Sequence, residues 1–297
     1  AVLKSGVVAL KDQAKIVPYI DVTIKDEVIY KNRLLMLDII ANNNWQRPIY
    51  FSGGSFGDDD YLWMKDYLQM DGVVYKLVPI KTPVDKDNPF DMGRVDADKS
   101  YEIVKNWDWG NSGDPAVYHD IETRRNGLTY RSNLARIAEA LLKENKLDKA
   151  REILDLAMEK MPVDTFAFYS LLEPYMQMYY SVNQPEKARD IYAQLAVVYQ
   201  EKLLYFSSFK TNEQIDMRRE IYTDMERYRA VVTVLLAEDT KQYALAEAIK
   251  FNEYIKLFPY LYNPDEGIEL EDQSASNSDT EIPAEASLQE LLQSQAN

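Results

Sequence analysis

Residues 131–162 read RSNLARIAEALLKENKLDKAREILDLAMEKMP, and this stretch decides the fold. Apolar residues recur in it at helical spacing, small alanines share a face with larger side chains, and a proline ends the second periodic run. This pattern is typical of one tetratricopeptide repeat of about 34 residues, a pair of antiparallel helices. Because such helices approach closely only across small side chains, we expect Ala138, Ala150 and Ala157 to be nearly fully buried.

The turn between the two helices is predicted at Asn145, because asparagine tolerates the left-handed backbone that often ends a helix. Asp148 is expected to cap the second helix by accepting a hydrogen bond from a free backbone amide. Its carboxylate would then satisfy one of the donors that the start of a helix leaves unpaired.

Two further copies of the pattern follow in the sequence. The apolar positions of the second copy are Leu172, Tyr175, Tyr179, Ala188, Tyr192 and Leu195. Those of a third, degenerate copy are Val231, Val234, Leu235, Ala246, Ile249 and Tyr254. We therefore predict three tetratricopeptide-like hairpins over residues 126–262, about the smallest number that stacks stably, forming an α–α superhelix.

Residues 1–125 have a different texture and are predicted to form a small mixed α/β domain. The pattern predicts, in chain order, a helix over 26–40, a strand over 47–52, a helix over 59–70 and a strand over 72–80. Residues 81–118 are rich in Pro, Asp, Gly and Asn and are expected to form a long connector. The fold class is thus an α+β N-terminal domain followed by all-α hairpins, predominantly α overall.

Charge and composition exclude several classes of function. The chain has 297 residues, a net charge of −15 and no cysteine. Nine carboxylates and no Lys or Arg follow Pro264, so residues 263–297 are expected to be an acidic, mostly disordered tail. An acidic chain without a basic stripe is a poor partner for nucleic acid. No apolar run reaches the roughly 20 residues that cross a bilayer.

Cofactor and metal sites have little support in the sequence. With one histidine and no cysteine, only carboxylates remain as metal ligands, and Asp58, Asp59 and Asp60 lack the alternating spacing of a calcium loop. Neither a phosphate-binding loop nor a dinucleotide-binding glycine motif is present. We expect no metal and no cofactor.

One motif raises the question of catalysis. Residues 53–57 fit G-x-S-x-G between a predicted strand and a predicted helix, which is the setting of a nucleophile elbow at Ser55. His119, the single histidine, is the only imidazole base available to it. Too few strands surround Ser55 for a hydrolase sheet, so a glycine-rich connection is the favoured interpretation, and no catalytic residue is predicted.

Two aromatic groups are candidate ligand sites, because Trp and Tyr stack on apolar faces while their polar edges form hydrogen bonds. The first group is Trp45, Arg47 and Tyr50, and the second is Trp107, Trp109, Tyr118 and Asp120, with Arg124 close behind. Core packing is the favoured role for Trp45. For Trp107 and Trp109, in a loop rich in Gly, Asn and Asp, packing and ligand binding are equally open.

Several strings are specific enough to suggest a family. They are NWQRPIYF at 44–51, DYLQ at 66–69, YKLVPIK at 75–81, YHD at 118–120, TRR at 123–125 and YRSNLAR at 130–136. Through them the chain resembles the C-terminal soluble part of a family of uncharacterised bacterial multi-pass membrane proteins whose membrane half looks like protein mannosyltransferases. The resemblance implies a fragment on the periplasmic side of the inner membrane, attached to the membrane only through a missing N-terminal region.

The resemblance also implies a function. The chain would be a non-catalytic accessory domain of a glycosyltransferase-like membrane protein, binding an acceptor protein, a glycan or partner subunits. The catalytic acid of such an enzyme would lie in the missing half. A stand-alone tetratricopeptide module that binds a protein or peptide is the alternative, and a serine hydrolase using Ser55 is a remote third hypothesis.

Overall fold

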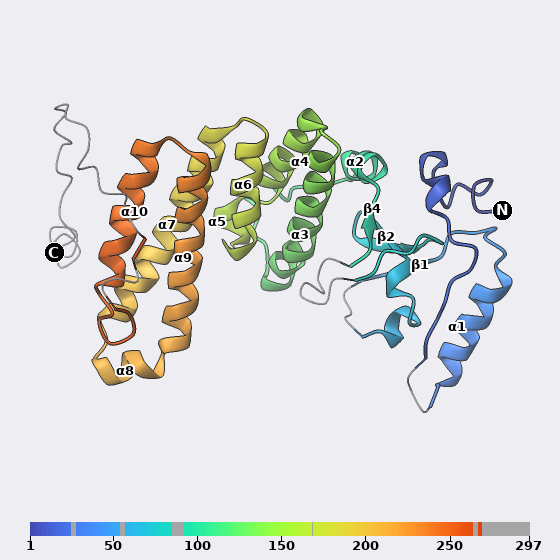
Figure 1. The fold of residues 1–297 in the computed structure, drawn as a ribbon, viewed down its shortest axis with the longest axis horizontal. Coiled ribbons are helices and arrows are strands. Elements are labelled where there is room, and N and C mark those ends of the chain that lie inside the picture. The colour runs from blue at the N-terminus through green and yellow to red at the C-terminus, as the bar shows by residue number, and fades with distance from the viewer. Residues whose placement is uncertain (25–27, 54–56, 85–91, 168, 264–266, 269–297) are drawn as a thin grey trace. The chain divides into compact units, whose positions relative to one another are not determined.

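The computed structural model describes residues 1–24, 28–53, 57–84, 92–167, 169–263 and 267–268. The chain divides into two compact units, Ala1–Pro174 and Tyr175–Asn297. The first contains a four-stranded mixed sheet with helices and a helical hairpin, and the second contains packed helices (Figure 1). The predicted class, an α+β part followed by helix pairs and predominantly α, is confirmed.

The sheet of the first unit has the strand order β1-β3-β2-β4. Its strands are β1 (Tyr50–Phe51), β2 (Leu68–Asp71), β3 (Val74–Leu77) and β4 (Arg94–Val95). Strand β3 pairs antiparallel with β1 and β2, and β4 pairs parallel with β2. A two-residue turn joins β2 to β3, and its first residue, Gly72, has a φ of 70°. Glycine adopts this backbone without strain, which favours the tight hairpin.

The helix predicted over residues 59–70 is wrong. Two short 3₁₀ turns, η2 (Asp59–Tyr61) and η3 (Lys65–Tyr67), precede strand β2 instead. Leu62 and Trp63 have φ values of 52° and 58°, in the left-handed region, and this interrupts the helical path. Leu68 and Met70 are then fully buried in the sheet. The spacing of apolar residues over 59–70 also fits a helix, but pairing with β3 makes residues 68–71 a strand.

The long connector predicted over residues 81–118 also contains regular structure. Strand β4 is followed by α2 (Ala97–Lys105), whose first turn is capped by the Asp96 side chain, a 3.5 Å acceptor for the amide of Lys99. Ala97 and Val104 are fully buried on the inner face of α2. The predicted connector was therefore too long, because the Asp cap and the short apolar stripe behind it were missed.

The beginning of the chain packs against the sheet as irregular segments. A 3₁₀ turn, η1, spans Leu10–Lys15, and the amide of Val17 then donates a 2.9 Å hydrogen bond to the carbonyl of Pro79. Helix α1 spans Lys31–Asn42, five residues later at its start than predicted, and residues 25–27 lie outside the described residues. Strand β1 is likewise shorter than the predicted strand over 47–52.

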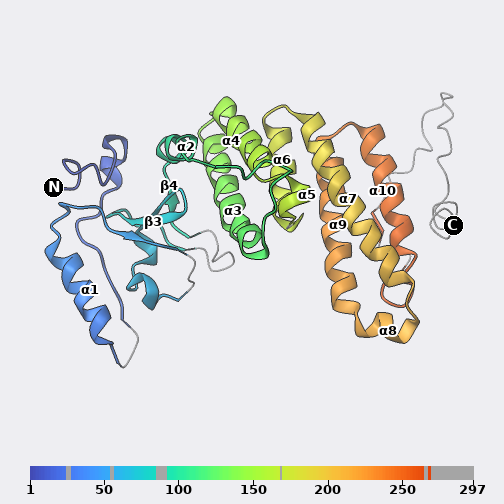
Figure 2. The ribbon, with the colours of Figure 1, turned by 180° about the vertical axis from the view of Figure 1, so that it is seen from behind.

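The predicted first hairpin is confirmed. It consists of α3 (Ile121–Lys143) and α4 (Leu147–Lys160), which run side by side in both views (Figures 1 and 2). Ala138, Ala150 and Ala157 are all fully buried. Asn145 has a φ of 58°, as expected for the turn. Asp148 is not the cap, because the N-cap residue is Lys146, two residues earlier, and the Asp148 carboxylate instead pairs with Arg151 at 2.8 Å.

Short pieces follow this hairpin, and the second unit then continues with longer helices. The elements are α5 (Val163–Phe166), η4 (Tyr169–Leu171), α6 (Glu173–Ser181), α7 (Pro185–Ser207), α8 (Thr211–Asp216), α9 (Arg218–Glu238) and α10 (Lys241–Ile255). Helices α7, α9 and α10 pack together within the second unit (Figure 1). The guanidinium of Arg189 on α7 donates two hydrogen bonds, of 2.5 and 2.8 Å, to the carboxylate of Asp239, the residue directly after α9.

The apolar register of the second copy is confirmed, and that of the third is partly wrong. Every apolar position predicted for the second copy is buried, whereas in α10 both Ala246 and Ile249 are exposed. The buried face of α10 carries Ala244, Ala248 and Phe251 instead. Residues 269–297 lie outside the described residues, so the acidic tail and the three-part division at 125 and 262 stay predictions.

Candidate functional site

An aromatic cleft lies in the first unit between the end of α2 and the beginning of α3. The rings of Trp107, Trp109 and Tyr130 meet pairwise at centroid distances of 5.4, 5.5 and 5.8 Å. The cavity they border has a volume of about 420 Å³. Its apolar walls are Val73, Trp107, Trp109, Tyr130, Met161 and Phe166, and Asp108, Ser112, Thr123, Asn126 and Gly127 complete the lining. These residues together are called the aromatic cleft below.

Trp107 is held in place from two sides. Its amide donates a 3.1 Å hydrogen bond to the carbonyl of Val104 at the end of α2. Its indole lies directly over the β2–β3 turn, where a Cβ atom added to Gly72 would be 2.6 Å from Cζ2 of the ring. The glycine therefore serves both the left-handed turn and the close approach of the tryptophan.

The opposite wall comes from one face of α3. Thr123, Asn126 and Tyr130 are spaced by three and four residues, which places their side chains on the same side of the helix. Gly127 is buried between them, and a Cβ atom there would lie 2.7 Å from Cδ1 of Phe166. The missing side chain at Gly127 thus lets Phe166 close the floor of the cleft.

Two polar atoms of the cleft have no hydrogen-bond partner among the described residues. They are Nε1 of Trp109 and Oγ of Ser112, and both atoms are buried. Buried polar groups are nearly always hydrogen-bonded, so each one left without a partner needs an explanation. These two atoms mark the part of the cleft wall where hydrogen-bonding capacity is unused within the described residues.

The structure brings only part of the second predicted group into the cleft. Trp107 and Trp109 line it, but Tyr118 is 84% exposed and points to solvent. Asp120 caps α3 by accepting a 2.7 Å hydrogen bond from the amide of Thr123, which holds the pKa of Asp120 below its ordinary value. Arg124 is partly buried, and its Nε atom has no partner in the described part of the chain.

The first predicted group does not form a shared site. Trp45 is partly buried and packs against both hydrophobic clusters of the sheet, with a φ of 57°. Arg47 is exposed. The hydroxyl of Tyr50 donates a 3.3 Å hydrogen bond to Asp71, and neither Trp45 nor Arg47 borders the cavity beside Tyr50. For Trp45 the structure favours core packing.

Sequence reasoning missed Tyr130 and the polar residues Thr123 and Asn126, which line the cleft from the same side of α3. Their signal was present, because Thr123, Asn126 and Tyr130 repeat at helical spacing just after the tryptophan loop. The contribution of Phe166 had no local signal, since it reaches the cleft from beyond α4.

The other candidate chemistries find no site in the described part of the chain. Ser55 lies outside the described residues, and the ring of His119 packs at 5.1 Å from that of Phe166. No group of three His, Asp or Glu residues suited to a metal occurs in the described ranges. Asp59 and Asp60 pair with Arg33 at 2.6 and 3.4 Å.

Comparison with known proteins relates part of the chain to a described family. None of the described helices is long and apolar enough to span a bilayer. No curated protein and no solved structure matches the chain significantly. Residues 1–99, which contain the sheet and α1, match the family model described as TMEM260-associated domain 2, a domain associated with a family of membrane proteins.

Proposed function

We propose that this chain is a non-catalytic accessory part of a glycosyltransferase-like membrane protein and that its aromatic cleft binds a saccharide ring. The observation that carries the proposal is the wall of Trp107, Trp109 and Tyr130 around a cavity of about 420 Å³. The match of residues 1–99 to a domain associated with membrane proteins supports the accessory role. The resemblance of the sequence to the outer part of mannosyltransferase-like proteins supports the periplasmic side of the membrane as its location.

The chemistry of the cleft favours a neutral sugar. A pyranose presents an apolar face of C–H groups, which suits indole and phenol rings, and a rim of hydroxyl groups, which suits side-chain oxygens and amides. Asp108, Ser112, Thr123 and Asn126 offer such partners. The lining contains one carboxylate and no Lys, Arg or His. The absence of cations from the lining makes a sugar phosphate or a nucleotide sugar a poor ligand. The ligand we propose is therefore acceptor or product glycan rather than an activated donor.

Tryptophan emission tests this binding directly. The four tryptophans of the chain, at positions 45, 63, 107 and 109, all belong to the first unit. Titration with D-mannose, D-glucose and mannobiose should change the emission saturably, and Trp109→Ala should remove most of the change. Trp45→Phe is the matched control, because Trp45 packs in the sheet and should leave the response intact. If no sugar gives a saturable response, or Trp109→Ala responds like the native chain, saccharide binding at this cleft is refuted.

The accessory role is tested in the full-length membrane protein. Trp107→Ala combined with Trp109→Ala should lower glycan transfer in cells while the amount of protein in the membrane stays the same. Deletion of residues 128–262 should lower transfer or association with partner subunits further. Unchanged transfer and unchanged partner association after this deletion would rule out the accessory role.

A further inference from the structure

Helix α1 is unusual because it has apolar residues on two opposite sides and no fully buried residue. Leu37 and Ile40 face inward and pack on the cluster of Met64, Tyr67 and Leu77. The outward side carries Leu34, Leu35, Met36 and Ile39, which are 51, 61, 50 and 58% exposed. The same side also carries the exposed polar residues Lys31, Asp38 and Asn42, so the outward side of α1 is amphipathic. Four large apolar side chains exposed on one short helix form a patch of the kind that marks an interaction surface, so we expect the outward face of α1 to meet an apolar surface.

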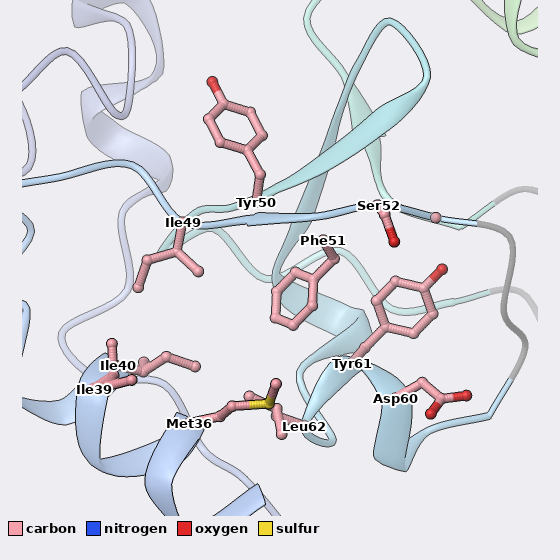
Figure 3. Close-up of a pocket in the computed structure, with 11 residues that line it drawn as sticks. Met36, Ile39, Ile40, Ile49, Tyr50, Phe51, Ser52, Asp60, Tyr61 and Leu62 are labelled. Carbon is pink, nitrogen blue, oxygen red and sulfur yellow. The ribbon is translucent and has the colours of Figure 1, made fainter. Parts of the chain in front are cut away.

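The exposed face continues into a cavity of about 340 Å³ between α1, β1 and the turn η2. Figure 3 shows Ile49 and Phe51 on the same side of the strand as Met36 and Leu62, whereas Tyr50 points away. The polar oxygens of Ser52 and Asp60 lie at one end of this cavity (Figure 3). The cavity is thus apolar along α1 and polar at a single end.

Charges around this face nearly cancel, although the chain as a whole carries −15. Arg33 bridges Asp59 and Asp60, and Lys65 lies 5.8 Å from the ring centroid of Tyr61. The remaining charges on α1 are those of Lys31 and Asp38. A nearly neutral apolar face on an acidic chain does not suit a strongly basic partner peptide, and it suits an uncharged lipid surface.

Two further features favour a bilayer as the occupant. Val28 and Tyr30, directly before α1, are each 70% exposed, and tyrosine is enriched where proteins meet the interface of a membrane. The face also lies within residues 1–99, the part that matches a domain associated with membrane proteins. We propose that the outward face of α1, with the cavity beside it, lies on the surface of a lipid bilayer. The proposal does not depend on saccharide binding by the aromatic cleft.

Because the chain has no cysteine, one introduced cysteine can report on this face alone. The Leu35→Cys variant is labelled with an environment-sensitive nitrobenzoxadiazole dye. The emission maximum of the dye should shift to shorter wavelength when phosphatidylcholine vesicles are added. Ile249→Cys is the matched control, because Ile249 is a 50% exposed apolar residue on α10, and it should show no shift. Addition of salt or of phosphatidylglycerol should not strengthen the shift at position 35, because the face is close to neutral.

Vesicle flotation provides an independent readout with the unlabelled full chain. Leu35→Asp combined with Ile39→Asp should lower the partition coefficient by roughly tenfold or more, because two charges replace side chains that enter the interface. Leu236→Asp, at a 37% exposed position of α9, should leave the partition coefficient unchanged. Unchanged tryptophan emission confirms that the α1 variant folds, and an unchanged helical circular dichroism signal confirms it for Leu236→Asp, because the second unit has no tryptophan.

Three outcomes would overturn the proposal. The first is the absence of a shift with vesicles, and the second is an equal shift at positions 35 and 249. The third is a shift that grows with protein concentration without vesicles, which would mean that a second copy of the chain covers α1. The two proposals fail separately. A chain that binds sugar but not vesicles refutes only this proposal, and a chain that binds vesicles but not sugar refutes only the proposed function.

Discussion

The side-chain amide of Asn133, on α3, donates a 2.9 Å hydrogen bond to the carbonyl of Gly72 in the β2–β3 turn. Asn133 is 6% exposed, so this bond is shielded from water. It ties the sheet to the helical hairpin within the first unit. The ring of Trp107 also lies against this turn, so the bond helps to hold one wall of the aromatic cleft.

Asn133→Ala should therefore destabilise the first unit. The carbonyl of Gly72 would stay buried without its donor, which costs about 1 to 3 kcal/mol. Denaturant unfolding followed by tryptophan emission measures this unit alone, because all four tryptophans lie in it. Asn32→Ala, at an exposed position of α1, serves as the control and should lie within about 0.5 kcal/mol of the native chain. Equal midpoints for the two variants would contradict a structural role for the Asn133 bond.

The close crossing of α3 and α4 leads to a second prediction. Ala150 is fully buried, so Ala150→Leu should overpack the crossing and cost roughly 1 to 3 kcal/mol. Lys146 is not a neutral reference, because it pairs with Asp98 at 2.6 Å. Lys143→Ala is the better control, since the Lys143 side chain is 71% exposed and its ion pair with Glu139 lies along its own helix. A midpoint for Ala150→Leu as high as that of Lys143→Ala would show that the assigned helical register is mistaken.

The first hairpin could be predicted from sequence because its determinants are local. Ala138, Ala150 and Ala157 mark a close helix crossing within one stretch of chain, and Asn145 marks the turn. In α10 the apolar residues are nearly continuous, so the sequence allows either of two helix faces to be the buried one. Packing in the second unit, which no local pattern specifies, buries Ala248 rather than Ile249.

The same distinction holds for the sheet and for the cleft. Residues 68–71 fit a helical period, and only pairing with β3 makes them a strand. Trp107 and Trp109 were identified as candidates from their loop, but Tyr118 in the same loop points outward. Which loop residue meets α3 depends on tertiary packing, and neither composition nor spacing reveals that.

Gly72 and Gly110 form a matched pair for a third prediction. Both have positive φ values, 70° and 50°, so alanine at either position strains the backbone by about 1 kcal/mol. At Gly110 the new Cβ would meet no atom within 4 Å, whereas at Gly72 it would lie 2.6 Å from the ring of Trp107. Gly72→Ala should therefore lose clearly more stability than Gly110→Ala and should also shift the emission of Trp107. If both variants lose the same amount, the tryptophan is not packed on the turn.

A buried lysine makes the stability of the first unit depend on pH. Lys76 on β3 is 2% exposed, and its Nζ atom lies 3.4 Å from the carboxylate of Asp71. Burial is the main cause that lowers the pKa of Lys76 from 10.5 to about 8, and Lys99 on α2, which is 2.8 Å from the same carboxylate, adds to the shift. Tyr50 on β1 also faces this group, and burial raises its pKa.

The sign of the effect follows from proton binding. Below pH 8 Lys76 is protonated in both the folded and the unfolded chain, so burial of its charge lowers the free energy of unfolding. Between about pH 8 and the ordinary lysine value the folded chain releases its proton first, so the free energy of unfolding should rise with pH. The raised pKa values of Lys99 and Tyr50 take effect only near pH 10 and above. Asp71, whose pKa is lowered, stays ionised throughout this window.

The free energy of unfolding of the native chain should therefore rise by about 2 kcal/mol between pH 7.5 and 9.5, from the proton-linkage relation. Lys76→Met should remove this gain, because it keeps the apolar stem of the side chain and has no proton to release. Lys143→Met, at an exposed position, should keep the slope of the native chain. Unfolding midpoints by tryptophan emission across this pH range provide the measurement. Parallel pH profiles for the native chain and Lys76→Met would mean that Lys76 is not the group responsible.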